Sequence, residues 1–323
     1  MGPLTRILIT GASGFVGASA TRAARARGIE VVAVYRRNPR PEWADDTGII
    51  PIRIDLSDTS NTKPLTEAME TVGAVIHAAA HLGDDAIAHE SDTLRGTQTL
   101  LDAMEGFDVA LVLISTIAVY DTMRLEPWQK LDESSPLEKP ESARDIYCAA
   151  KLRQEQLVRA SRRPAWLIRP GVVYGPRRTW NDLMGFNAAG LHVQIGQTGE
   201  LPLIHVDHLG AVLVQAAVTD PHGLQILNAI DDDRPTRARF LKAHRQTAGK
   251  PKAVLPLPYG FWLALVQGLK PISHKLPGLF REPIVKARLM PLHYPNTALR
   301  DALGGEDSDR FEVMLARCTK GAP

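Results

Sequence analysis

The sequence predicts an α/β protein in which helices cover both faces of a doubly wound parallel sheet, with a smaller, mostly helical lobe towards the C-terminus. Over the first two-thirds of the chain, short β-branched and apolar runs alternate with longer helical patterns, the order that builds a parallel sheet. Most of these runs are apolar throughout, as in strands covered on both faces. A glycine-rich turn also separates the first run from the first helical pattern.

The expected strands are short and rich in β-branched or aliphatic residues. They are residues 6–10, 30–35, 49–54, 74–78, 109–115 and 166–169. The stretches between them carry apolar residues at helical spacing. These expected helices are residues 15–27, 64–70, 86–104 and 141–161.

After Pro176 turns become denser, and Pro and Gly interrupt the chain more often. One further helix–strand pair, at residues 208–219 and 225–228, is expected to return to the main sheet. The other expected helices are residues 236–248, 259–269, 283–289, 296–303 and 308–317.

Composition and charge argue against several classes of protein. The chain has 323 residues, of which 44% are hydrophobic and 23% charged, an ordinary globular composition. Its net charge is +2 and its basic residues are dispersed, so no nucleic-acid partner is expected. Cys148 and Cys318 provide neither a disulfide framework nor a zinc site, so a cytoplasmic location is expected. No apolar run reaches the roughly 18 residues of a membrane span, and no signal-peptide pattern is present.

The turn after the first expected strand has the glycine spacing of a dinucleotide-binding loop. Gly11 permits the tight turn, Gly14 lets the backbone approach a pyrophosphate, and Gly17 lets the helix pack closely on the sheet. The start of the following helix then offers free N–H groups and a positive dipole end to the phosphates. The expected cofactor contacts of this loop are Gly11, Ser13, Gly14, Phe15, Val16 and Gly17.

The end of the second expected strand indicates which dinucleotide binds. An NAD site usually has Asp or Glu there, to accept hydrogen bonds from the ribose. This chain has Arg36 and Arg37, whose charge and geometry suit the 2′-phosphate of NADP, so NADP is favoured over NAD; two solvated surface arginines are the alternative. Asp55, at the end of the third strand, is expected either to hold the adenine amino group or to cap a helix.

A second group of residues could carry chemistry. Tyr147 and Lys151 are spaced to share one face of an expected helix, which is also how a plain amphipathic-helix pair is spaced. A nearby ammonium and a positive nicotinamide ring would lower the pKa of this tyrosine, which could then exchange a proton with an alcohol while hydride moves. Thr116, just beyond the buried run that ends at Ser115, could hydrogen-bond the reacting oxygen.

With further motifs, these residues make the chain resemble the extended short-chain dehydrogenase/reductases, also called the NAD-dependent epimerase/dehydratase family. The matching motifs come in the family's order at residues 10–17, 55–56, 77–80, 96–97, 115–120, 147–151, 169–176 and 205–207. The resemblance implies a Rossmann fold, Tyr147 as catalytic acid or base, Lys151 as its partner and Thr116 as the hydroxyl that positions the substrate. It also implies cofactor contacts at Leu56, Ala78, Ala79, Ala80, Ser115, Tyr147, Lys151, Pro170, Val172 and Val173.

Departures from the family pattern bear on the substrate. Ile117 and Ala118 follow Thr116 where 4,6-dehydratases carry an acidic pair, so a dehydratase is not expected. Val172 and Leu201 stand where sugar-nucleotide enzymes usually have Asn and Arg, and aliphatic contacts disfavour a buried diphosphate. A small, fairly apolar carbonyl substrate is therefore expected. The candidate substrate contacts are His81, Thr116, Ile117 and Arg177.

Other features have a structural interpretation beside a functional one. The aromatic and aliphatic helix at residues 259–266 is interpreted first as core, then as the wall of an apolar pocket, then as a membrane-surface contact. The arginines at 177–178 suit an acidic substrate group or a solvated loop equally well. Residues 231–233 are interpreted as a solvated turn, and His205 and His208 as structural residues, so no metal site is expected.

The sequence therefore predicts an NAD(P)-dependent oxidoreductase that moves hydride between nicotinamide and a carbonyl or secondary alcohol of a small molecule. A nucleotide-sugar 4-epimerase of the same family is the alternative, and a non-catalytic cofactor-binding sensor is a further one. The resemblance also implies a possible homodimer through the helices at 86–104 and 141–161. The expected division is residues 1–174 plus about 206–230 for the dinucleotide-binding domain, and about 175–205 plus 231–323 for the substrate-binding lobe.

Overall fold

A seven-stranded parallel sheet forms the centre of the computed structural model, which describes residues 4–60, 62–188, 190–276, 278–307 and 309–320. Its strands are β1 (Arg6–Thr10), β2 (Glu30–Tyr35), β3 (Ile49–Arg53), β4 (Ala74–His77), β5 (Ala110–Ile114), β6 (Ala165–Pro170) and β11 (Leu224–Ala229). They lie in the order β11-β6-β5-β4-β1-β2-β3, and every neighbouring pair is parallel. The doubly wound sheet and the return of the chain to it are therefore confirmed.

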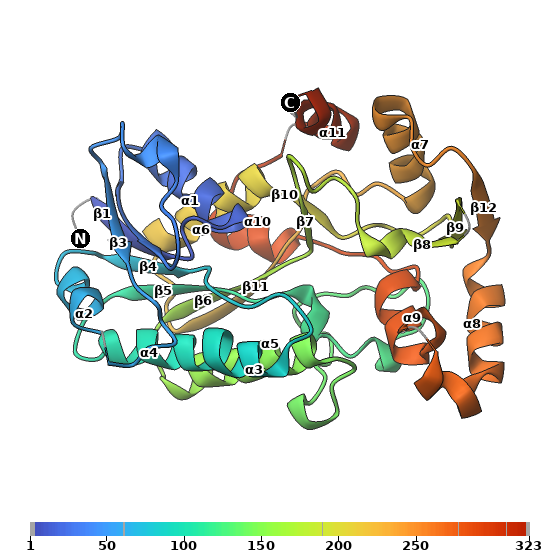
Figure 1. The fold of residues 1–323 in the computed structure, drawn as a ribbon, viewed down its shortest axis with the longest axis horizontal. Coiled ribbons are helices and arrows are strands. Elements are labelled where there is room, and N and C mark those ends of the chain that lie inside the picture. Colours follow the sequence, from blue (N-terminus) through green and yellow to red (C-terminus); the bar gives the residue numbers. More distant parts are fainter. Residues whose placement is uncertain (1–3, 61, 189, 277, 308, 321–323) are drawn as a thin grey trace.

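Helices cover both faces of this sheet (Figure 1). On one face lie α1 (Phe15–Ala26), α6 (Val206–Val218) and α10 (Thr297–Leu303), and on the other lie α2 (Lys63–Met69), α4 (Gly96–Ala103) and α5 (Ile146–Ala160). Leu213 of α6 and Leu65 of α2 are fully buried in two separate core clusters, one on each face. Burial on both faces explains why the strands are apolar throughout.

The helix expected at residues 86–104 is interrupted. It begins as α3 (Ala86–Ala88), continues as a π-helical segment at His89–Arg95, and becomes α4 only at Gly96. π-Helical segments are rare and often occur at functional sites. Here the segment carries Asp92, which lines the cleft described below.

The second lobe contains helices as expected, and also strands that the sequence does not predict. Its helices are α7 (Arg237–Ala248), α8 (Tyr259–Gly268), α9 (Glu282–Leu289) and α11 (Phe311–Lys320). β8 (Gly185–Ala188), β9 (Leu191–Ile195) and β12 (Val254–Leu257) form a three-stranded sheet, and β7 (Val172–Tyr174) pairs with β10 (Leu203–His205). These strands have only three to five residues each, too few for a clear alternating pattern.

The last part of the chain returns to the main sheet before it ends. α10 packs against α6 and β11, and its Leu299 and Leu303 join the core cluster on that face. α11 then packs against α7 of the second lobe (Figure 1). Among the described residues, we find no helix that combines the length and the apolar character needed to cross a membrane.

Candidate active site

A cleft of about 750 Å³ follows the carboxyl edge of the parallel sheet. Residues directly after each of the strands β1 to β6 line it, because parallel strands all end at the same edge. Every cofactor contact expected from the sequence lies in its lining: Gly11, Ser13, Gly14, Phe15, Val16, Gly17, Arg36, Arg37, Asp55, Leu56, Ala78, Ala79, Ala80, Ser115, Tyr147, Lys151, Pro170, Val172 and Val173. The structure thus brings these residues together, and their roles stay predictions.

Backbone contacts explain two of the glycines in the first turn. Gly11 has a φ of +61°, and a Cβ there would lie 2.9 Å from the backbone of Ala79. A Cβ on Gly17 would lie 2.2 Å from the carbonyl oxygen of Gly11, so α1 can approach the turn only without a side chain. α1 also has no side-chain cap, which leaves its first N–H groups available to a phosphate. This cradle fits a dinucleotide.

The arginines at the end of β2 have different surroundings. The Arg36 Nη1 donates to Asp92 Oδ2 at 2.7 Å, whereas no side-chain partner of Arg37 is found in the described ranges. Arg40 Nη1 donates to the Ser13 carbonyl at 3.3 Å and so brings a further guanidinium to the glycine loop. Sequence reasoning missed both Asp92 and Arg40, because neither belongs to a local motif and only the fold brings Asp92 to the cleft and Arg40 to the glycine loop.

Three side chains with possible catalytic roles meet at the end of β5. Thr116 follows this strand and makes a side-chain hydrogen bond with Tyr147. Tyr147 lies in the first turn of α5, which begins at Ile146 rather than at the expected residue 141. Asp145 fixes this start, since its side chain accepts a hydrogen bond from the Cys148 N–H at 2.8 Å. Lys151 lies one turn further along and lines the same cleft.

The pKa of Tyr147 moves in the direction opposite to the one expected. Burial raises the pKa of Tyr147 to about 12, and the hydrogen bond with Thr116 opposes this only in part. The ammonium of Lys151 is held elsewhere, since its Nζ donates to the Ile114 carbonyl and to Gln154 Oε1, both at 2.9 Å. In the chain by itself the Lys151 ammonium does not offset the effect of burial on Tyr147, and the tuning of the tyrosine by Lys151 with a bound nicotinamide stays a prediction. A phenol with this pKa keeps its proton at neutral pH, as a proton donor must.

A chain of buried polar side chains holds Lys151 in place. Gln154, which binds the ammonium, donates from Nε2 to Thr97 Oγ1 at 2.8 Å, and Thr97 Oγ1 lies 2.9 Å from His77 Nε2. His77 Nδ1 lies 2.7 Å from Thr10 Oγ1 in β1. Burial lowers the pKa of His77 to about 3 and the pKa of Lys151 to about 8. Neutral groups therefore hold the lysine, and its third N–H remains for a ligand hydroxyl.

A buried ion pair supports the strand end behind this site. Arg169 Nε and Nη2 donate to the two carboxylate oxygens of Glu155 at 2.8 and 2.6 Å, with 1% and 2% of the two side chains exposed. Ser115 Oγ donates to the same carboxylate at 2.6 Å, and Arg169 Nη1 donates to the Tyr120 hydroxyl at 2.9 Å. The hydroxyl of Ser115, an expected cofactor contact, is thus engaged in this pair. Pro170 follows Arg169 directly and so is fixed at the cleft.

Three of the expected substrate contacts do not line the cleft. Ile117 packs against the buried cluster that contains Tyr120, and His81 packs edge-on against His89 with ring centroids 4.8 Å apart. Arg177 is exposed in a turn, where its φ is +65°. The local pattern gave no information on which way each residue faces, and the roles of these three residues as substrate contacts stay predictions. Thr116 is the expected substrate contact that does line the cleft.

Arginines from three separate segments line the cleft in addition: Arg144, Arg178 and Arg288. Arg144 forms an ion pair with Glu138, and the Arg178 guanidinium lies 4.9 Å from the centroid of the Phe15 ring. Arg288 comes from α9, so the second lobe contributes to the cleft. No residue of α8 lines it, so the second interpretation of this helix, as the wall of an apolar pocket, has no support from this cleft. Three guanidinium groups in the lining of one cleft suit a substrate that carries an anionic group.

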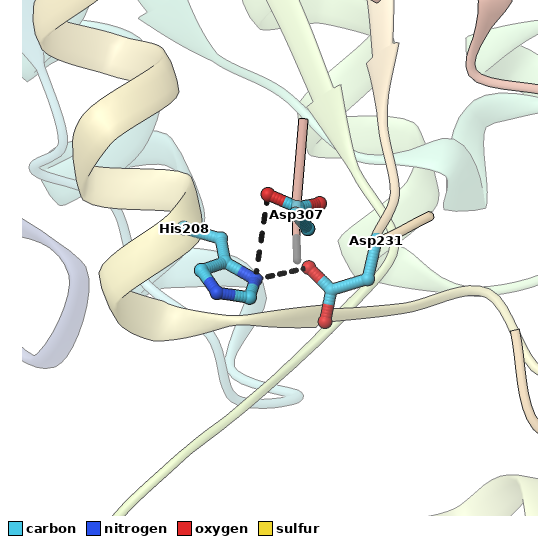
Figure 2. Close-up of side chains that lie close together, drawn as sticks. All are labelled: His208, Asp231 and Asp307. Atoms are coloured by element: carbon cyan, nitrogen blue, oxygen red, sulfur yellow. Dashed lines mark hydrogen bonds and ion pairs between the residues drawn. The ribbon is translucent and has the colours of Figure 1, made fainter. Parts of the chain in front are cut away.

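A His–Asp–Asp cluster lies outside the cleft and joins α6 to the C-terminal segment. Figure 2 shows His208 with its Nδ1 2.9 Å from Asp231 Oδ1 and 3.7 Å from Asp307 Oδ1. Each group already has partners, because Arg300 binds Asp307 at 2.5 Å and the backbone N–H of His205 donates to Asp231 at 3.0 Å. Asp231 is only 5% exposed, so the interpretation of this segment as a solvated turn is wrong.

Comparison with known proteins places the chain among dinucleotide-dependent enzymes. Residues 7–205 match the NAD dependent epimerase/dehydratase family. A ketoreductase of Stigmatella aurantiaca, which acts on a 4-hydroxy-2-methyl-3-oxo-4-farnesyl-3,4-dihydroquinoline-1-oxide, is 33% identical over 177 residues, or 53% of this chain and 51% of that protein. The match thus spans only about half of that relative's length.

A longer match is found with a 3-diazoavenalumate denitrifying reductase of a Streptomyces species. It is 27% identical over 263 residues, or 76% of this chain and 82% of that protein. Among solved structures, a UDP-glucose 4-epimerase from Bifidobacterium longum in complex with NAD+ and UDP superposes with a TM-score of 0.71 at 18% identity. The superposition covers 98% of this chain and 97% of that one, which shows that the two share a fold.

Proposed function

We propose that this chain, which belongs to the NAD-dependent epimerase/dehydratase family, is an NADPH-dependent reductase of a carbonyl group. The observation that carries the proposal is that Thr116, Tyr147 and Lys151 line one cleft with the glycine cradle after β1. The likeness to two proteins named as reductases supports it. A non-catalytic sensor would have no need of these three groups in one place.

Each of the three side chains has a separate role in the proposed reduction. NADPH, when bound, supplies a hydride. Thr116 and Tyr147 hold the substrate oxygen between their hydroxyl groups, and Tyr147 donates its proton to that oxygen as the carbonyl becomes a secondary alcohol. The raised pKa of Tyr147 keeps this proton in place until the transfer. Lys151 uses its third N–H to hold a ribose hydroxyl, while Gln154 and the Ile114 carbonyl fix the other two.

The preference for NADP over NAD rests first on Arg37, which lines the cleft and has no competing partner in the described part of the chain. Arg40 brings a second guanidinium to the glycine loop, but it is already paired with Glu42. Arg36 contributes less to binding of the 2′-phosphate, because its charge is already neutralised by Asp92. Asp55 accepts hydrogen bonds from the Ser57 N–H at 3.0 Å and the Ser57 hydroxyl at 2.7 Å, so it also caps a turn.

The proposed substrate is a small, fairly apolar ketone, for which Arg178 and Arg288 can hold an anionic group. These same arginines favour a second candidate function, a nucleotide-sugar 4-epimerase, because a sugar diphosphate is anionic. Val172, which lines the cleft, disfavours the epimerase function, because an aliphatic side chain cannot hydrogen-bond to a diphosphate sugar. Leu201 is fully buried in a core cluster and does not reach the cleft. A cytoplasmic location and a homodimer stay predictions.

The experiment that separates the two functions identifies the nucleotide that the purified protein retains. After desalting, native mass spectrometry is expected to find an empty protein that takes up NADP in preference to NAD. Oxidation of NADPH with a panel of ketones then measures the reduction. Retained stoichiometric NAD would contradict both the cofactor and the reductase proposal, because an epimerase regenerates its cofactor in every cycle and has no need to release it.

A further inference from the structure

Helix α8 is apolar except for Gln267 and the hydroxyl of Tyr259, but only one of its sides is covered. Trp262 and Val266 are buried in a core cluster of the second lobe. Phe261 and Leu265 point the other way and are 60% and 40% exposed, with Ala264 and Gly268 on the same side. A helix that is apolar all round is normally buried on all sides. The exposed side of α8 therefore lacks a partner in the described chain.

The apolar surface extends beyond the helix. Leu255, in β12 just before α8, is 44% exposed, and Ile272, just after α8, is 48% exposed. Figure 1 shows β12 and α8 together at the outer end of the second lobe, away from the central sheet. We call these four side chains, Leu255, Phe261, Leu265 and Ile272, the α8 surface. Large apolar side chains that are exposed together in one segment of the chain mark a candidate interaction site.

Cations predominate around the α8 surface, and Glu282, which accepts a hydrogen bond from Gln267 Nε2 of α8 at 2.9 Å, is an anion beside them. Its flanking cations are Lys250, Lys252, Lys270, Lys275 and Arg281, and all of them are exposed. No Asp or Glu occurs between Asp233 and Glu282 in the sequence. The chain as a whole is nearly neutral, with a net charge of +2, so this concentration of cations is local. An apolar face bordered by Lys and Arg is typical of helices that lie in the interface of an anionic bilayer.

We propose that the α8 surface docks on a membrane that contains anionic lipid, with the apolar side chains among the acyl chains and the flanking cations against the headgroups. A second copy of the chain fits this surface less well, because pairing two α8 surfaces would bring like charges together. The arrangement requires no membrane-spanning segment, since the helix lies in the plane of the interface.

Docking would also bring the cleft close to the lipid. α9 packs against α8, and Ala287 and Arg288 of α9 line the cleft. A substrate that dissolves in the bilayer would then be concentrated near its entrance. Membrane binding itself does not depend on the proposed reductase activity, so each can fail while the other holds.

Vesicle sedimentation with the full chain tests the proposal. The protein is expected to sediment with vesicles of phosphatidylcholine and phosphatidylserine, to bind phosphatidylcholine alone weakly, and to lose binding as salt increases. Phe261→Asp together with Leu265→Asp should weaken binding at least about tenfold, because two apolar side chains no longer enter the bilayer. Lys252→Gln with Lys275→Gln should weaken it about fivefold for each charge removed.

Val313→Asp on α11 is the matched control, because Val313 is 43% exposed but lies outside the α8 surface. It should bind vesicles as the unchanged protein does. Thermal unfolding of every variant verifies that the fold is kept. The proposal is overturned if the protein does not sediment with anionic vesicles. It is equally overturned if the variant at positions 261 and 265 binds these vesicles as well as the unchanged protein does. It is also overturned if that variant only converts a dimer to a monomer in sedimentation velocity, which would identify a second copy as the occupant.

Discussion

The guanidinium of Arg36 and the carboxylate of Asp92 form an ion pair at 2.7 Å that links the end of β2 to the π-helical segment before α4. Both residues line the cleft, so a negative charge lies where the sequence alone predicts only positive charge. A phosphate bound by Arg36 would have to compete with Asp92. The cofactor preference thus depends on a contact between segments that are far apart in the sequence.

Removing that carboxylate should strengthen NADPH binding. Asp92→Asn is expected to raise the affinity for NADPH by up to about fivefold, since it frees Arg36 and removes repulsion from a partly exposed pair. Arg37→Ala should lower the same affinity about tenfold, because a charged hydrogen-bond donor is lost. Fluorescence titration with NADPH and NADH measures both effects. An unchanged ratio of the two affinities in Asp92→Asn would show that the 2′-phosphate does not lie at this end of β2.

The phenol of Tyr147 is expected to be required for turnover and not for binding. Tyr147→Phe should lower kcat at least about 100-fold, because the proton donor is removed, while the Kd for NADPH stays within error. Tyr259→Phe is the matched control, since the Tyr259 hydroxyl is buried without a hydrogen-bond partner among the described residues and does not line the cleft. Full activity in Tyr147→Phe would assign the proton transfer to another group.

Gln154 is expected to act as a positioning residue for Lys151. The pKa of Lys151 is lowered to about 8, so the ammonium loses its proton above that pH, and the rate of reduction should fall there. Gln154→Glu puts a negative charge beside Nζ, which raises the pKa of Lys151 and should move this fall to higher pH. Gln154→Met removes an acceptor and should move it to lower pH. Profiles of kcat/KM against pH that shift in the same direction in both variants would contradict the assignment.

The Arg169–Glu155 pair is expected to contribute strongly to stability. Glu155→Gln leaves the buried guanidinium without its counter-charge, and should lower the free energy of unfolding by about 3 kcal/mol or more. The exposed pair of Arg153 and Glu90 provides the control, because its two side chains are 50% and 56% exposed. Glu90→Gln should cost less than about 1 kcal/mol. Denaturant unfolding measures both, and equal effects would mean that burial does not set the strength of these pairs.

His77 is expected to make the protein sensitive to acid. Its pKa is lowered to about 3 by burial, while in the unfolded chain it is 6.5, so between these values the unfolded state binds the additional proton. Stability is therefore lost as the pH falls below 6.5, by about 2 kcal/mol at pH 5 from this residue alone. In His77→Gln the free energy of unfolding should therefore fall by about 2 kcal/mol less between neutral pH and pH 5, which makes its slope against pH shallower. His222→Gln is the control, because the His222 side chain is 86% exposed; an unchanged slope in His77→Gln would contradict the assignment.

Local patterns in the sequence were sufficient for the sheet and for much of the site. The glycine loop and the Tyr147–Lys151 spacing each lie within one turn or one helix, and their physical reasons are local: a positive φ at Gly11, a close approach at Gly17, and one helical turn between the two side chains. Alternating strands and helices likewise predict where the strand ends meet, because parallel strands finish at one edge.

Tertiary structure alone decided the contacts between distant segments. Asp92 neutralises Arg36, Gln154 takes up the ammonium expected to tune Tyr147, and Arg178 rather than Arg177 enters the cleft. No local sequence pattern predicts these contacts, because each depends on which way a side chain faces after packing. The same holds for α8, whose sequence is apolar almost throughout. Whether such a helix is core or surface depends on what packs against it, and here one side stays exposed.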